Sequence, residues 1–209
     1  TGVVSHDLRS PLNIAQGRLE IVREAHDSEH VATVDRALDR MEAIIEDTLT
    51  LARQGQTVDE TDIEPVAIDD VVDHSREIVE TGDSEIRLID DFVVQADRNR
   101  LYQLFENLIR NAVEHSDEPV TIRVGKLDVM FTSTRVESDG TFSFYVEDDG
   151  PGVPKEKRDD VFEAGESTNP QGTGFGLSIV KRIAEAHGWE VDLRESFDGG
   201  ARFEFTNVR

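Results

Sequence analysis

Residues 172–186 read GTGFGLSIVKRIAEA, a glycine-rich turn that runs directly into a helical pattern. Glycines alternate at Gly172, Gly174 and Gly176, and apolar residues then recur at helical spacing. Such a turn exposes several backbone N–H groups at a helix N-terminus, where the helix dipole adds about half a positive charge. The stretch therefore predicts a phosphate-binding loop, with a purely structural turn as the alternative. It matches neither the Walker A pattern nor the dinucleotide-binding glycine pattern.

The composition fits a folded chain without a membrane-spanning segment. At 209 residues the chain is long enough for one or two domains, and 37% hydrophobic residues can supply a core. Its mean hydropathy is −0.45, and no apolar run approaches the ~20 residues that a membrane-spanning helix requires. The absence of cysteine excludes disulfides and thiolate metal sites. The chain starts at Thr1 in the middle of a pattern, so we expect it to be part of a longer protein.

The charge of the chain limits its partners. Asp and Glu number 45 against 22 Lys and Arg, which gives a formal net charge of −23. Acidic residues spread over the whole length, with very few lysines, are typical of proteins from a high-salt cytoplasm, where ions screen self-repulsion. An ordinary acidic protein is the alternative. In either case the charge opposes binding to nucleic acid or to an anionic membrane.

The N-terminal part predicts a helical hairpin. Apolar residues recur at spacings of three and four over 3–25 (Leu8, Leu12, Ala15, Leu19, Val22) and over 30–53 (Val31, Val34, Leu38, Met41, Ile45). This is the heptad pattern of packed helices. A short polar turn joins the two helices, and a lone hairpin cannot bury both apolar stripes. We therefore expect residues 1–54 to dimerise into a four-helix bundle.

A polar segment over residues 55–64 predicts a linker, and the pattern changes after it. Within residues 65–209 we expect helices over 69–80, over 98–115 and from 176 to 186, and a helical turn near 157–162. Strands are expected over 85–89, 92–95, 120–129, 141–147, 189–195 and 202–206. The chain is thus predicted to be α+β, with a helical hairpin followed by a two-layer α/β sandwich.

Two further motifs carry side chains suited to a nucleotide. Asn107 and Asn111 are four residues apart, so they share one face of a helix. An amide oxygen is a hard, neutral ligand for Mg²⁺ and does not repel a triphosphate, although such a pair is also common on a solvated helix face. Asp148 ends a strand and is followed by Gly150 and Gly152, which let the backbone approach a flat ligand closely. Its carboxylate can accept a hydrogen bond from an exocyclic amine, with an acidic surface turn as the alternative.

Taken in order, these motifs resemble the ATP-binding domain shared by sensor histidine kinases, Hsp90, MutL and type II topoisomerases. The resemblance covers residues 65–209 and implies a Bergerat-type sandwich that binds ATP between the Asn helix and a lid over residues 153–171. It implies that Asp148 bonds the adenine amino group and that Asn111 holds Mg²⁺, with Asn107 in support. The other ATP-binding residues that it implies are Gly150 and Gly152 at the adenine, Phe162 as the anchor of the lid, and Gly172, Thr173, Gly174, Gly176 and Leu177 at the phosphates.

The start of the chain resembles the phospho-acceptor box of histidine kinases. Residues 5–12 read SHDLRSPL, against the family pattern His-Glu/Asp-x-x-Thr/Ser/Asn-Pro. His6 lies off the apolar seam, so it can face the ATP-binding domain, and a neutral imidazole nitrogen can attack phosphorus near pH 7. Asp7 can accept the other ring N–H and fix the tautomer. A solvated side chain is the usual alternative for a lone helical histidine.

Asn107 bears on the choice within this superfamily. ATP-hydrolysing relatives place a Glu at the matching position, where it activates water, and an amide cannot act as that base. The resemblance therefore implies a dimeric protein-histidine kinase, in a cytoplasmic segment whose sensor domain lies upstream. It would phosphorylate His6 and pass the phosphoryl group to an Asp of a response-regulator receiver domain. An ATPase clamp of the Hsp90 and MutL kind and an inactive pseudokinase scaffold stay open as alternatives.

The sequence departs from the family pattern after the Mg²⁺ asparagine. A basic residue commonly stands three positions after Asn111, followed by an aromatic one, but here these positions hold Glu114 and His115. Candidates for the missing phosphate contact are Arg110, His115 and the bases of the lid, Lys155, Lys157 and Arg158. The remaining histidines carry little information, and we interpret His74 and His187 as surface residues.

Overall fold

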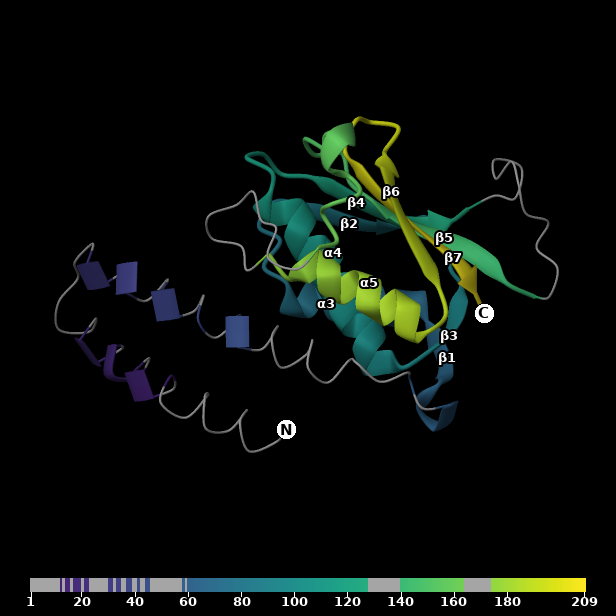
Figure 1. Cartoon of the computed structure of the whole chain (residues 1–209). Coiled ribbons are helices and arrows are strands. Elements are labelled where there is room, and N and C mark those ends of the chain that lie inside the picture. Colours follow the sequence, from purple (N-terminus) through teal and green to yellow (C-terminus); the bar gives the residue numbers. More distant parts are fainter. Residues whose placement is uncertain are drawn as a thin grey trace.

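The computed structural model describes residues 58, 60–127, 140–163 and 174–209, together with scattered helical residues between Leu12 and Ile45 (Figure 1). Every residue described between positions 12 and 22, and between 30 and 45, is helical, as the heptad pattern predicts. Across these described parts, no helix combines the length and the apolar character needed to cross a membrane. The predicted fold class, α+β with a helical region ahead of a sheet-based domain, is confirmed.

A five-stranded sheet forms one layer of the sandwich, in the order β2-β4-β5-β7-β6. These strands are β2 (Glu85–Leu88), β4 (Thr121–Lys126), β5 (Phe142–Glu147), β6 (Glu190–Glu195) and β7 (Ala201–Val208). The β2–β4 pair is parallel and the other neighbours are antiparallel. Buried and partly exposed residues alternate along most of β7, because only one face of the sheet meets the core. A second, two-stranded sheet pairs β1 (Glu64–Ala67) with β3 (Val93–Ala96).

In the described part of the sandwich, α3 (Ile68–Ile78), α4 (Arg98–Glu114) and α5 (Gly176–Ala186) form a layer against one face of the sheet (Figure 1). The core between the layers centres on Phe144 of β5, whose ring centroid lies 6.2 Å from that of Phe105 and 4.7 Å from that of Phe205. All three rings are fully buried. Burial of each contributes about 1.5–3 kcal/mol, so this stack holds helix α4 against strands β5 and β7.

The local sequence determines where α4 begins and which of its faces packs against the sheet. Asp97 is the N-cap, and its side chain accepts hydrogen bonds from the backbone N–H groups of Asn99 and Arg100 at 3.0 and 3.2 Å. Such a cap stabilises a helix by about 1 kcal/mol. The apolar stripe is buried (Leu101, Leu104, Phe105, Leu108, Ile109, Ala112). Because the stripe faces the sheet, Asn107 and Asn111 fall at its edge, where both are half-buried.

The interpretation of His187 as a surface residue is wrong. The ring is half-buried where the C-terminus of α5 meets the N-terminus of α4. Its Nδ1 donates to the carbonyl of Ile183 at 2.7 Å, and its Nε2 accepts from the N–H of Asp97 at 3.0 Å. The ring also stacks on Trp189, with centroids 4.7 Å apart. Burial lowers the pKa of His187, so the neutral imidazole joins the two helix ends. His74, by contrast, keeps 33% of its side chain exposed.

Candidate functional site

The first component of the site is a buried carboxylate at the end of β5. Asp148 is only 7% exposed, and its Oδ1 accepts hydrogen bonds from the N–H groups of Gly150 and Ala201 at 2.9 and 3.1 Å. Within the described residues, no hydrogen bond reaches the second oxygen, Oδ2. Loss of solvent on burial raises the pKa of Asp148, against the two backbone donors that lower it. Among the described residues, Oδ1 of Asp148 thus has two hydrogen-bond donors and Oδ2 has none.

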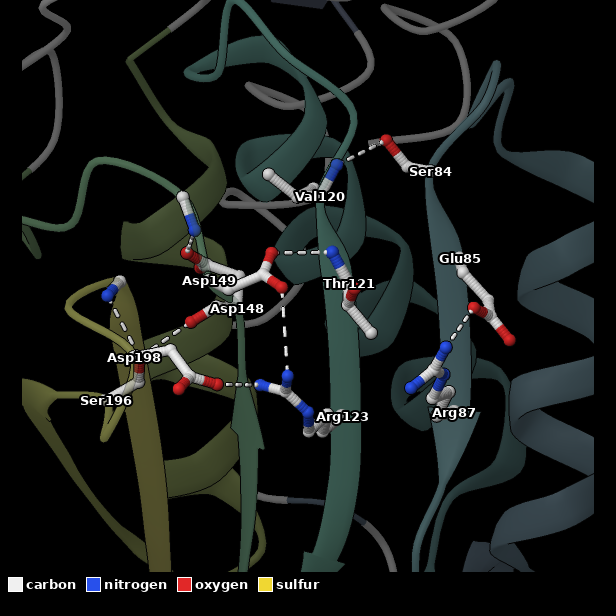
Figure 2. A network of polar contacts seen from close by, with 12 residues as sticks. Ser84, Glu85, Arg87, Val120, Thr121, Arg123, Asp148, Asp149, Ser196 and Asp198 are labelled. Atoms are coloured by element: carbon white, nitrogen blue, oxygen red, sulfur yellow. Dashed lines mark hydrogen bonds and ion pairs between the residues drawn. The ribbon is translucent and has the colours of Figure 1, made fainter.

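The neighbouring carboxylate has a different environment. The Oδ1 of Asp149 accepts a hydrogen bond from the N–H of Thr121 at 2.7 Å, and its Oδ2 lies 3.7 Å from the guanidinium of Arg123 (Figure 2). Both oxygens of Asp149 thus serve contacts with β4. Of the two adjacent acids, Asp148 is the one with an oxygen that no described residue contacts.

The glycines after Asp148 permit a close approach between two loops. Gly152 has a φ of +68°, and a Cβ on it would lie 2.6 Å from the carbonyl oxygen of Gly199. A Cβ on Gly200 would overlap the backbone of Asp148. No side chain fits at either position, so the loop over residues 148–152 packs directly on the turn between β6 and β7.

The second component is an amide that faces the start of α5. The Nδ2 of Asn107 donates to the carbonyl of Gln103 at 2.7 Å, which fixes the orientation of the amide. Its Oδ1 points at the helix start, since a Cβ on Gly176 would lie 3.1 Å from it. Asn111 lies one turn further along α4 and is half-buried. Its side chain makes no hydrogen bond to another described residue, so its amide is available to a ligand.

The start of α5 forms the third component. Gly174 has a φ of +75°, which an L side chain adopts only at a cost, and α5 begins at Gly176 as the glycine pattern predicts. The N-cap residue, Phe175, provides no side-chain cap for the first N–H groups. Because uncapped N–H groups and the helix dipole attract anions, this helix start suits a phosphate. Leu177, in the first turn, is half-buried against the core.

The first half of the predicted lid is anchored to the sheet. Phe162 packs edge-on against Phe203 of β7, with ring centroids 6.3 Å apart. Arg158 donates from Nε to the carbonyl of Val153 at 2.8 Å and pairs with Glu195 at 3.1 Å. Arg158 is therefore engaged at the base of the lid. The 3-10 turn beside it, η3 (Lys155–Lys157), carries two exposed lysines.

Among the described residues, the predicted site residues make contacts within two groups. Asp148, Gly150 and Gly152 form one loop, and Asn107 meets Gly176 across the α4–α5 contact. His6, Asp7, Gly172 and Thr173 lie outside the described residues.

The turn between β6 and β7 supports Asp148, a role that sequence reasoning did not predict. The Oγ of Ser196 donates to the carbonyl of Asp148 at 2.7 Å, and Gly200 packs on the same backbone. The available signal was the glycine pair at 199 and 200, since paired glycines in a short turn often mark a close backbone approach.

Comparisons with known proteins agree with these components. The sequence profile of the His Kinase A (phospho-acceptor) domain matches residues 1–57. The profile of the histidine kinase-, DNA gyrase B-, and HSP90-like ATPases matches residues 96–208, more than half of the chain. The two profiles follow one another in the order that the motifs predict.

Similar proteins of known sequence or structure include a sensor histidine kinase and a sensor protein. The chain is 28% identical to the sensor histidine kinase ZraS of Klebsiella oxytoca, over 97% of this chain and 44% of that protein. It is 30% identical to the sensor protein RstB of Escherichia coli, over 97% of this chain and 47% of that protein. A solved structure of full-length ShkA in complex with AMPPNP has a TM-score of 0.72 at 26% identity, covering 100% of this chain and 46% of that one.

The chain spans less than half the length of these three relatives. Within that span it has both matched domains, an acceptor domain and an ATPase domain, in one polypeptide. The chain therefore belongs to the histidine kinase family, of which it forms a catalytic core.

Proposed function

We propose that this chain is an ATP-dependent autokinase that phosphorylates His6 and passes the phosphoryl group to an Asp of a response-regulator receiver domain. The observation that carries the proposal is the Asp148 carboxylate, which is buried and has one oxygen without a partner among the described residues. A buried acceptor of this kind favours a ligand that donates a hydrogen bond, since an unsatisfied buried oxygen is costly. The exocyclic amine of adenine is such a donor.

The α4–α5 contact supports the placement of the phosphates. In the proposal they lie at the N-terminus of α5, between Gly174 and Leu177. Backbone N–H groups and the helix dipole offset their negative charge there. This local positive end matters, because the chain as a whole carries a net charge of −23 and would otherwise repel a triphosphate.

The residues on α4 fit a magnesium ion that is shared with the substrate. Asn111 offers a neutral amide oxygen that no described residue engages. The described residues contain no group of three or more His, Asp or Glu that could hold a metal alone, so an ion at Asn111 would depend on the phosphates for its other ligands. When bound, Mg²⁺ would supply positive charge against the phosphates. Lys155 or Lys157 could add a basic contact, whereas Arg158 is already paired with Glu195.

In the transfer step, a ring nitrogen of His6 forms a bond to the γ-phosphorus while the bond from that phosphorus to the bridging oxygen breaks, and ADP leaves. Asp7 accepts the proton from the other ring nitrogen and so offsets the positive charge on the ring. Asn107 favours this outcome over hydrolysis, because its amide donates to the carbonyl of Gln103 and cannot deprotonate water. This is the reason for preferring the kinase to the ATPase clamp.

The domains and partners follow from the same reasoning. We infer a dimerisation and acceptor hairpin over residues 1–54, a linker over 55–64 and an ATP-binding domain over 65–209. In the hairpin, predicted seam residues are about half exposed in the single chain (Val22 45%, Val34 48%, Met41 52%). Exposed apolar side chains at heptad spacing favour burial against a second copy.

The acidic surface supports the inference that this protein works in a high-salt cytoplasm.

The test is incubation of the chain with γ-labelled ATP and Mg²⁺ at high salt, comparing the wild type with His6→Gln. An acid-labile, base-stable label on the wild type and none on His6→Gln is the expected result. Release of phosphate without labelled protein would favour the ATPase clamp, and nucleotide binding with neither would favour the pseudokinase scaffold. A label that persists in His6→Gln would overturn the assignment of His6.

A further inference from the structure

The turn between β6 and β7 contains a buried serine with two backbone partners. Ser196 is only 5% exposed, and its Oγ donates to the carbonyl of Asp148 at 2.7 Å. The same Oγ accepts from the N–H of Gly200 at 2.9 Å. Figure 2 shows Ser196 in the turn that follows β6, near Asp148 at the end of β5. One hydroxyl thus connects the end of β5 with the far side of the turn.

Apart from the N–H of Gly150, which donates to Oδ1, the other hydrogen bonds of Asp148 join it to Ala201, at the end of the same turn. Its N–H donates to the carbonyl of Ala201 at 2.9 Å, and the N–H of Ala201 donates to its Oδ1 at 3.1 Å. Gly200 approaches its backbone so closely that a Cβ would overlap it. With Oδ1 held in this way, the direction of Oδ2 depends on how the turn sits against the end of β5.

A second contact joins the same turn to the loop over residues 148–152, through Arg123 of β4. Arg123 of β4 pairs with Asp198 at 2.9 Å and lies 3.7 Å from Asp149, so one guanidinium joins the turn to the residue after Asp148 (Figure 2). These ion pairs are partly exposed, which limits their strength. Ser196 is buried and contacts Asp148 itself, whereas Arg123 contacts the neighbouring Asp149.

We propose that Ser196 is a positioning residue for the Asp148 carboxylate, and through it for recognition of the exocyclic amine of adenine. The inference rests on the proposed function, because it takes Asp148 to be the adenine contact. Without the hydroxyl, the carbonyl of Asp148 loses its donor and the N–H of Gly200 loses its acceptor. The end of β5 is then free to shift against the turn, and Oδ2 no longer points in one fixed direction. A serine that merely stabilised the turn would affect all nucleotides equally.

The test compares ADP with IDP, which has a carbonyl oxygen in place of the exocyclic amine. Calorimetry on the full chain measures ADP by direct titration and IDP by competition against ADP. Ser196→Ala should weaken ADP binding about five- to tenfold, the value of one lost hydrogen bond. It should leave IDP binding unchanged, so the preference for ADP over IDP falls by the same factor. Ser196→Thr keeps the hydroxyl and should restore most of the preference.

Ser75→Ala is the matched control. Ser75 is also fully buried and its Oγ also donates to a backbone carbonyl, that of Val71 at 2.8 Å, but it lies in α3, outside the turn. This variant should lose stability without losing the preference for ADP. An unchanged preference in Ser196→Ala, whether both affinities fall or neither does, would overturn the positioning role. A wild type that binds ADP no better than IDP would instead overturn the proposed function.

Discussion

At the scale of single residues, two adjacent aspartates differ in what surrounds them. Asp148 is buried and has one oxygen that no described residue contacts, whereas Asp149 accepts from the N–H of Thr121 and pairs with Arg123. The pKa of Asp148 is raised from its ordinary value of 3.8, chiefly because burial removes solvent from the charge. The folded state therefore holds this proton more tightly than the unfolded state does. The resulting stability is present below pH 3.8 and is lost as the pH rises through the folded pKa.

The charge of Asp148 at neutral pH thus lowers the stability of the folded state. A variant without this charge should be at least as stable as the wild type but should bind ADP more weakly. Asp148→Asn keeps an Oδ1 for the N–H groups of Gly150 and Ala201 but places an NH₂ group where the adenine amine would donate. At pH 7 we expect its melting temperature to equal or exceed that of the wild type, by up to about 2–4 °C. ADP affinity should fall about 10- to 100-fold. Thermal melts and calorimetry measure the two quantities.

Asp149→Asn is the control for this prediction. It makes the same chemical change one residue away, where both oxygens already contact β4. ADP affinity should stay within about twofold of the wild type, because no ligand contact is assigned to Asp149. Equal losses of ADP affinity in both variants would mean that the loop as a whole, and not the Asp148 carboxylate, determines binding.

The sequence pattern indicated the residues to which we assign ligand contacts, but it did not indicate the residues that support them. Asp148, its glycines and Asn107 belong to short motifs with fixed spacing, so they could be predicted. Ser196 lies far from Asp148 in the chain, and their contact exists only because β5 and β7 are neighbours in the sheet. Nothing in a local pattern encodes that pairing.

At the scale of elements, periodicity predicted the helices and strands of the sandwich, with one exception. β1 (Glu64–Ala67) was not expected, because Pro65 and the polar residues before it are typical of a linker. Its only sheet partner among the described residues is β3, so it is an edge strand, where a proline costs little. A four-residue edge strand is too short to establish a period, which is why sequence reasoning missed it.

The stability of the contact between α4 and α5 depends on pH through the protonation of His187. The pKa of this ring is lowered from its ordinary value of 6.5 by burial. Its contribution to stability is therefore present above pH 6.5 and is lost as the pH falls through the folded pKa. Protonated Nε2 cannot accept from the N–H of Asp97, so the cap of α4 loses a neighbouring contact. We expect denaturant unfolding to show about 1 kcal/mol less stability at pH 5.5 than at pH 7.5 from this residue.

His187→Gln isolates that contribution, since glutamine keeps a neutral acceptor and does not titrate in this range. The difference in unfolding free energy between the wild type and His187→Gln should change between pH 7.5 and pH 5.5, in the direction that disfavours the wild type at low pH. His74→Gln is the comparison, because His74 lies on α3, where its ring stacks on Tyr102 and its Nε2 lies 3.3 Å from Glu106. A pH-independent difference for His187→Gln would contradict the role of the neutral ring.

At the scale of the whole molecule, acidic charge and apolar helix faces have opposite effects on self-association. A net charge of −23 makes two copies repel one another, and salt screens that repulsion. The partly exposed apolar residues at heptad spacing favour association, at about 1.5–3 kcal/mol for each side chain fully buried. The sandwich buries its own core, whereas the hairpin seam has apolar surface left over, so the dimer contact is expected in the hairpin.

The double variant Val34→Lys/Met41→Lys tests this expectation. These residues are seven positions apart and are 48% and 52% exposed in the single chain, so in a dimer they would face the second copy. Two added lysines reduce the net negative charge, so a loss of the dimer could not come from increased repulsion between the copies and would instead reflect the lost apolar contact and the cost of burying the two charges. Light scattering at high salt should give half the wild-type mass, with ADP affinity unchanged.

The control is Ile78→Lys, at a 55% exposed apolar position on α3, which should remain dimeric. A dimer in the double variant, or a monomer in Ile78→Lys, would place the contact outside the hairpin seam.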